Sequence, residues 1–126
     1  MGAAKESEMV KDQYYFGGAR ENLAQGERRW AAKCLVWGAA WAVAAWLKKA
    51  PPSPYFTVTE LRRRQYGRAM LPVLEQAAAL APLEEVAEWA NCWGLPTPSG
   101  TARLDLEEAI RTASASAEAV VPVEWD

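Results

Sequence analysis

A length of 126 residues limits the chain to one domain, or to a membrane anchor joined to a small helical domain. The chain has no histidine, which removes the usual general base and axial haem ligand, and its two cysteines lack the paired spacing of a zinc site. Alanine makes up about a fifth of the residues and the aromatic residues do not alternate with polar ones, so we expect an all-α fold.

The net charge of −2 hides an asymmetry between the two halves of the chain. Residues 1–70 carry 12 Lys or Arg against 6 Asp or Glu, a net charge of +6, whereas residues 71–126 carry 2 against 10, a net charge of −8. The basic half suits contact with anionic lipid headgroups or with acidic protein surfaces. Nucleic acid fits less well, because the basic residues flank an apolar segment instead of an aromatic stacking platform.

The first region, residues 1–29, is predicted to be a polar and aromatic arm followed by the start of a helix. We expect residues 1–19 to be irregular, because the aromatic triplet at residues 14–16 is followed by two glycines that should end its contact with a neighbouring surface. A helix then begins near Ala19 and continues into the apolar segment, since no proline intervenes.

The segment 30–48 is the strongest pattern in the chain and predicts a single transmembrane helix. From Trp30 to Leu47 it is apolar except for Lys33, and two basic residues lie on each side of it. As a helix these residues would extend over roughly 27 Å, close to the thickness of a bilayer core. Small residues four apart would let another helix approach closely. The residues expected to contact lipid or a neighbouring helix are Trp30, Trp37, Gly38, Trp41, Ala42 and Trp46.

The same segment also has the properties of a buried core helix. Only residues 34–47 are strictly apolar, and they would extend over roughly 21 Å, a length more typical of a core helix than of a span. The segment is apolar on all sides, which is compatible with lipid or with full burial. A soluble all-α domain with residues 31–47 as its core helix is therefore the alternative.

A proline-rich linker, residues 49–56, is expected to separate this helix from an acidic helical region, residues 57–126. Thr57 and Glu60 resemble a capping box at the start of a helix. Pro72 then interrupts an apolar stripe of helical spacing, which predicts a kink or two short helices.

Two further helices are predicted in the acidic region. Pro82 suits the first turn of a helix that ends at Gly94. Asp105, with a glutamate three residues later, forms a second capping box and opens a helix that continues to about Ala119. The final residues, 120–126, are expected to form an extended tail whose apolar side chains dock on a neighbouring surface.

Basic residues on both sides of the linker form a candidate contact site. Three consecutive arginines spread over about 200° of a helix, but Arg64 and Arg68 share one face. We expect this group to contact lipid phosphates or an acidic partner, and a solvated helix face is the alternative. Its members are Lys48, Lys49, Arg62, Arg63, Arg64 and Arg68.

No group of residues predicts catalysis. Glu84, Glu85 and Glu88 are explained by the positive end of a helix, which favours acidic side chains. Ser114 and Ser116 lack a base that could activate them as nucleophiles. No glycine-rich phosphate loop is present. We therefore expect no catalytic residue, metal, cofactor or small-molecule substrate.

These patterns predict a non-catalytic, single-span accessory subunit of a large energy-transducing membrane complex of the respiratory-chain type. Its expected partners are lipid and the other subunits of that complex, and nucleic acid is not expected. The mitochondrial inner membrane is the first expected location and the thylakoid membrane the second. This prediction rests on similarity of architecture alone. The alternative function is that of a soluble all-α protein-interaction domain.

Overall fold

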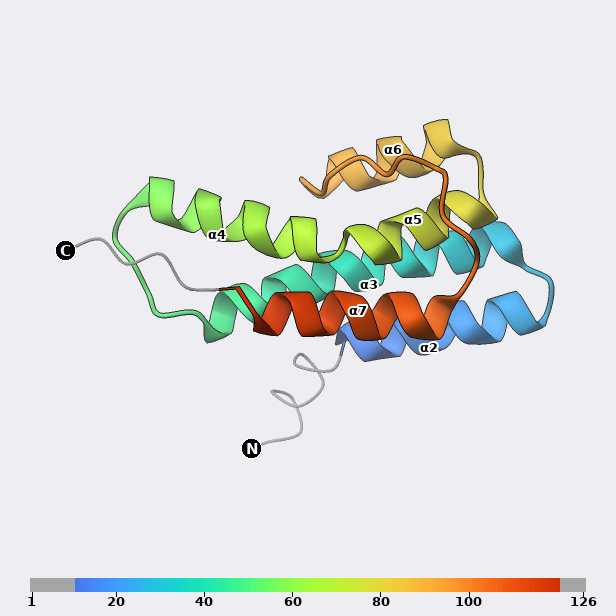
Figure 1. Ribbon diagram of the computed structural model, residues 1–126, viewed down its shortest axis with the longest axis horizontal. Helices are drawn as coiled ribbons and strands as arrows, with labels where there is room; N and C mark the ends of the chain where they lie inside the picture. Colours follow the sequence, from blue (N-terminus) through green and yellow to red (C-terminus); the bar gives the residue numbers. More distant parts are fainter. Residues whose placement is uncertain (1–10, 121–126) are drawn as a thin grey trace.

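The computed structural model describes residues 11–120, which form a bundle of α-helices (Figure 1). No strand occurs among these residues, so the predicted all-α fold is confirmed for this part of the chain. The helices are α2 (Lys11–Ala24), α3 (Arg28–Lys49), α4 (Phe56–Ala69), α5 (Leu71–Leu80), α6 (Leu83–Cys92) and α7 (Leu106–Glu118).

The long helix α3 lies at the centre of the bundle. Helix α2 packs along it as the first arm of an antiparallel hairpin, and α4, α5 and α6 pack against its other sides (Figure 1). Helix α7 covers α4 and α5, and an ion pair between Arg20 and Glu107 joins it to α2. Leu35, Val36 and Ala39 of α3 have no exposed surface. The hydrophobic core is therefore built around α3.

Among the described residues, α3 is the one helix whose length and composition would allow it to cross a membrane. Its 22 residues include a window of 18 with a mean hydropathy of 1.3. Half of that window is buried inside the protein. The same amino acids that resemble a membrane span thus also supply the core of the helical bundle.

The N-terminal aromatic residues are helical, so the prediction of an irregular arm through residue 19 is wrong for residues 11–19. Helix α2 passes through both glycines at 17 and 18, and the ring of Phe16 is only 2% exposed. A second difference is the turn at Gly26, whose φ of +79° ends α2 and reverses the chain before α3 begins. Residues 1–10 of the predicted arm lie outside the described residues.

Prolines, a glycine and a capping residue bound the later helices. One residue separates α4 from α5, and Pro72 lies in the first turn of α5, which confirms two short helices. Helix α6 follows Pro82 and ends before Gly94, which has a φ of +70°. Asp105 caps α7 by accepting a hydrogen bond from the N–H of residue 108. The predicted cap at Thr57 is wrong, because α4 begins one residue earlier without a side-chain cap.

Candidate functional site

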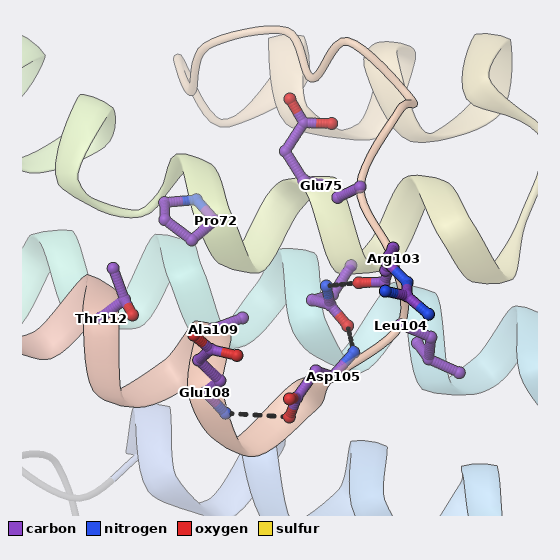
Figure 2. A pocket seen from close by; sticks show the side chains of 10 residues that line it. Pro72, Glu75, Arg103, Leu104, Asp105, Glu108, Ala109 and Thr112 are labelled. Carbon is purple, nitrogen blue, oxygen red and sulfur yellow. Dashed lines mark hydrogen bonds between the residues drawn. The ribbon is translucent and has the colours of Figure 1, made fainter.

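One hollow on the described surface lies between α5, α7 and the loop that joins α6 to α7 (Figure 2). It has a volume of about 530 Å³, and its walls are a mixture of polar and apolar side chains. Gln76, which is 4% exposed, donates a hydrogen bond from Nε2 to the carbonyl of Arg103 and accepts one from the N–H of Asp105, each at 2.6 Å. The only strongly buried polar side chain on this wall is therefore engaged in holding the loop.

Glu75 holds the same loop a few residues earlier. Its carboxylate accepts hydrogen bonds from the N–H and hydroxyl of Ser99 at 2.8 Å and from the N–H of Gly100 at 2.9 Å. Partial burial raises the pKa of Glu75, but these hydrogen bonds outweigh it and hold the pKa below its ordinary value. The ionised carboxylate of Glu75 thus accepts backbone hydrogen bonds and has a structural role. We therefore prefer the second hollow, described next, as the candidate site.

The second hollow, which we name the aromatic groove, lies over α3 between α2 and the end of α6. It has a volume of about 480 Å³ and a predominantly apolar lining. A smaller hollow of about 180 Å³ shares three of its residues and continues along α3 toward α4. The groove is lined by Tyr15, Trp37, Ala40, Trp41, Ala44 and Trp93, and its continuation adds Val43, Leu47, Arg63, Gly94 and Leu95.

One wall of the aromatic groove is a row of rings held edge to face. The ring centroids of Tyr14 and Tyr15 are 5.4 Å apart, and those of Tyr15 and Trp37 are 5.8 Å apart, with interplanar angles of 84° and 70°. Such pairs add stability beyond the area they bury. Trp41 is 37% exposed and Trp93 is 55% exposed, so two large apolar side chains remain available to a ligand.

Positive charge surrounds the exposed tryptophans of α3. Lys11 Nζ lies 4.1 Å from the ring centroid of Trp41, within the range of a cation–π contact. One turn before Trp37 on the same helix, Lys33 Nζ lies 4.7 Å from the ring of Trp30 and 5.4 Å from that of Trp89. No carboxylate lines the aromatic groove or its continuation within residues 11–120.

The structure divides the predicted helix-packing residues into two groups. Trp37 and Trp41 line the aromatic groove, and Trp30 is half exposed at the start of α3. Gly38 and Ala42 are buried, and a Cβ atom built on Gly38 would lie 2.5 Å from the ring of Phe16. The predicted close approach of another helix at Gly38 is therefore made by α2 of the same chain.

Trp46 belongs to neither group, because it is partly buried and packs against α4. Its ring stacks on that of Tyr66 with a centroid distance of 6.1 Å and an interplanar angle of 23°. Lys49, which follows on the exposed side of α3, places Nζ 4.9 Å from the ring of Trp46. Trp46 thus joins α3 to α4 and takes no part in the aromatic groove.

Arg62 was predicted to contact lipid or a partner, but the structure buries its side chain. It is 5% exposed, and its guanidinium donates a hydrogen bond to the carbonyl of Pro51. A helix buries one side, and three consecutive arginines must point in three directions, so Arg62 points inward to the linker between α3 and α4. The other members, Lys48, Lys49, Arg63, Arg64 and Arg68, are exposed.

Arg63 is the one predicted basic residue that lines the continuation of the aromatic groove. Its Nε lies 3.7 Å from Glu60, an ion pair one helical turn away on the surface. The sequence patterns did not predict that Tyr15 and Trp93 belong to this site. Tyr15 was expected in an irregular arm, and Trp93 falls near the end of the helix predicted between Pro82 and Gly94. Their meeting over α3 depends on how the helices pack.

No metal-binding group of three His, Cys, Asp or Glu side chains occurs among the described residues. The aromatic groove offers rings, small apolar residues and cations, which can bind and orient a ligand. No protein-family model, curated protein or solved structure matches the chain. The geometry of the groove therefore carries the functional argument.

Proposed function

We propose that the chain is a soluble, all-α protein-interaction domain that docks a partner protein in the aromatic groove and performs no chemistry. The observation that carries this proposal is the division of α3 into two faces. The aliphatic face, with Leu35, Val36 and Ala39, is fully buried in the bundle. The opposite face, with Trp37 and Trp41, is left open as a groove.

The buried face supports a domain that folds in water. Burying an aliphatic side chain such as Leu35 or Val43 stabilises a fold by about 1.5–3 kcal/mol relative to leaving it exposed, and α3 buries several such residues. Transfer of α3 to lipid would require α2 and α5 to separate from it. Lipid would then replace protein contacts that are already apolar, so no hydrophobic gain would offset the lost packing.

The open face supports a partner-binding role. Tryptophan and tyrosine are enriched in protein interfaces, and hot-spot residues are often tryptophan in a well-packed pocket. Trp41 and Trp93 are partly exposed beside the small residues Ala40 and Ala44, so a partner side chain could reach the floor of the groove. A site of this kind gains free energy by burying apolar area and needs no catalytic group.

Site-specific photo-crosslinking tests this function in the organism that makes the protein. A benzophenone amino acid replaces Trp93 in one variant and the exposed Arg111 of α7 in a matched control. We expect a defined protein adduct from position 93 and none from position 111. Adducts with lipid at position 93, or the same protein adducts at both positions, would contradict docking in the aromatic groove.

The second candidate function is the single-span accessory subunit of an energy-transducing membrane complex. The observation that favours it is the length and composition of α3, whose 22 residues would extend over about 33 Å. Arg28 and Arg29 begin the helix, and Lys48 and Lys49 end it, as basic residues often flank a span. Location in the mitochondrial inner membrane or the thylakoid membrane stays a prediction of this candidate alone.

Washing membranes with alkaline carbonate separates the two candidates. A protein that spans the bilayer stays with the membrane pellet, whereas an interaction domain is released to the supernatant. We expect release, followed by purification of a monomer without detergent. Retention in the pellet would replace the proposed function with the second candidate.

A further inference from the structure

We propose that the ligand of the aromatic groove is an amphipathic α-helix of a partner protein, with acidic residues beside its apolar stripe. This inference rests on the proposed function, because it names the class of partner that the groove accepts. The shape of the groove and the charge around it carry the argument separately.

The shape of the aromatic groove matches one face of a short helix. Ala40 and Ala44, one turn apart on α3, form a floor of small side chains. Trp93 and the row of rings that ends at Trp37 rise on either side of this floor. From Trp37 to Leu47 the groove and its continuation follow α3 for roughly 15 Å, which is about three helical turns. Apolar residues at i, i+4 and i+7 of a docked helix would lie along such a floor.

The positive charge around the aromatic groove favours a partner helix with acidic residues beside its apolar stripe. Lys11 Nζ lies over the ring of Trp41, beside the middle of the aromatic groove, and Arg63 lines the continuation, so cations are present at two points along the groove. Lys33 is one turn before Trp37 on α3. No carboxylate of the described chain lines either hollow, although Arg63 is paired with the surface residue Glu60 at 3.7 Å. A helix with Glu or Asp beside its apolar stripe would therefore be attracted by Lys11 and would compete with Glu60 for Arg63.

The same charges disfavour two other ligands. A second copy of the chain related by a two-fold axis would bring the basic surface at Lys11 and Arg63 against the same basic surface of the other copy. A flat bilayer surface would contact the protruding Trp41 and Trp93 but would leave the alanine floor between the walls empty. A helix fills that floor, so it is the ligand that the observations favour.

The experiment selects ligands from a display library of helical peptides of about 15 residues, a length at which isolated helices begin to be stable. Leucine is kept at i, i+4, i+7 and i+11, and the flanking positions vary among Glu, Lys, Gln and Ser. The target is the full chain. Counter-selection uses Ala44→Gln, which fills the floor with a neutral side chain, and Trp93→Ala, which removes one wall. Circular dichroism of both variants identifies the one that keeps the wild-type fold.

We expect an excess of Glu in the flanking positions of those peptides that bind the wild-type chain but not the groove variants. The best peptide is then synthesised, and its dissociation constant is measured from the tryptophan fluorescence of the protein. Lys11→Glu combined with Arg63→Glu should weaken binding at least about tenfold. Arg111→Glu, the same charge change on α7, should leave the dissociation constant unchanged.

Three results would overturn the inference in different ways. Groove-dependent peptides with basic or neutral flanks would reject the acidic helix but leave docking in the aromatic groove intact. Groove-dependent binding to vesicles of phosphatidylglycerol and phosphatidylcholine, with no peptide selected, would assign the groove to lipid. No groove-dependent peptide, together with a protein adduct from position 93, would reject a helical ligand while the proposed function stands.

Discussion

The ring of Phe16 lies against the backbone of Gly38 so closely that a Cβ atom at residue 38 would be 2.5 Å from Cε1 of the ring. Phe16 is 2% exposed, so its ring has no free space to move into. This contact sets the distance between α2 and α3, because any side chain at residue 38 would push the helices apart.

Gly38→Ala is predicted to destabilise the protein, although alanine is the better helix former. Overpacking a full core costs about 1–3 kcal/mol, and the gain in helix propensity is up to about 1 kcal/mol. We expect the free energy of unfolding to fall by about 1–2 kcal/mol as the net of these two effects. Denaturation in urea, followed by far-UV circular dichroism, measures it.

Gly17→Ala is the matched control, because Gly17 also lies inside a helix but a Cβ atom there would meet nothing within 4 Å. We expect this change to stabilise the protein by about 0.5–1 kcal/mol. If Gly38→Ala stabilised the protein as much as Gly17→Ala, Phe16 would not pack on Gly38, and the hairpin of α2 and α3 would be wrong.

Two substitutions in α3 distinguish a core helix from a membrane span. Leu35 is fully buried, so Leu35→Ala should lower the free energy of unfolding by about 2–5 kcal/mol. Ala40 lines the aromatic groove, where the guanidinium of Ala40→Arg can reach water, so this variant should fold and unfold like the wild type. In a membrane span Ala40→Arg would be the more damaging of the two changes, since arginine near the bilayer centre costs about 2.5–3.5 kcal/mol of insertion energy.

Glu75 should make stability depend on pH through the loop that it holds. Its pKa is lowered in the folded state, so its contribution is fully present above the unfolded pKa of about 4.3 and is lost as the pH falls through the folded value. Glu75→Gln should therefore be less stable than the wild type at about pH 7, and the difference should shrink toward about pH 3. Thermal unfolding across this range measures both proteins. An unchanged difference at all pH values would show that ionisation of Glu75 does not stabilise the loop.

Arg62→Ala is predicted to be the most damaging alanine substitution in the arginine cluster. The guanidinium of Arg62 is buried and donates to the carbonyl of Pro51, and hydrogen bonds from charged groups contribute about 1.5–3 kcal/mol. Arg64→Ala and Arg68→Ala should change stability by less than about 0.5 kcal/mol, because both side chains are exposed. Equal losses for all three variants in chemical denaturation would contradict the inward position of Arg62.

Local signals predicted the ends of several helices correctly. Pro72 lies in the first turn of α5, just after the break from α4, Asp105 caps α7, and Gly94 lies just beyond the end of α6. Each of these effects acts on the backbone of the residue or its near neighbours, so the sequence carries it directly. The break at Gly26 belongs to the same class, and its glycine is a signal that could have divided the predicted continuous helix into α2 and α3.

The candidate site could not be predicted in the same way. Trp37 and Trp41 were predicted to contact lipid or a neighbouring helix, but Tyr15 and Trp93 reach them from distant parts of the chain. The burial of Arg62 likewise depends on where the linker between α3 and α4 passes. Both features follow from the packing of whole helices, and periodicity within one helix does not contain that information.

The sequence by itself determined that the described chain is helical, because alanine-rich composition, helical spacing and the cap at Asp105 act locally. It also determined that α3 is apolar on all sides. Only the tertiary structure decided what covers those sides within residues 11–120: α2 and α5 bury the aliphatic face, and the aromatic groove leaves Trp41 exposed. The physical reason is that the same apolar side chains are favourable in lipid and in a protein core, so hydropathy alone cannot distinguish a membrane span from a core helix.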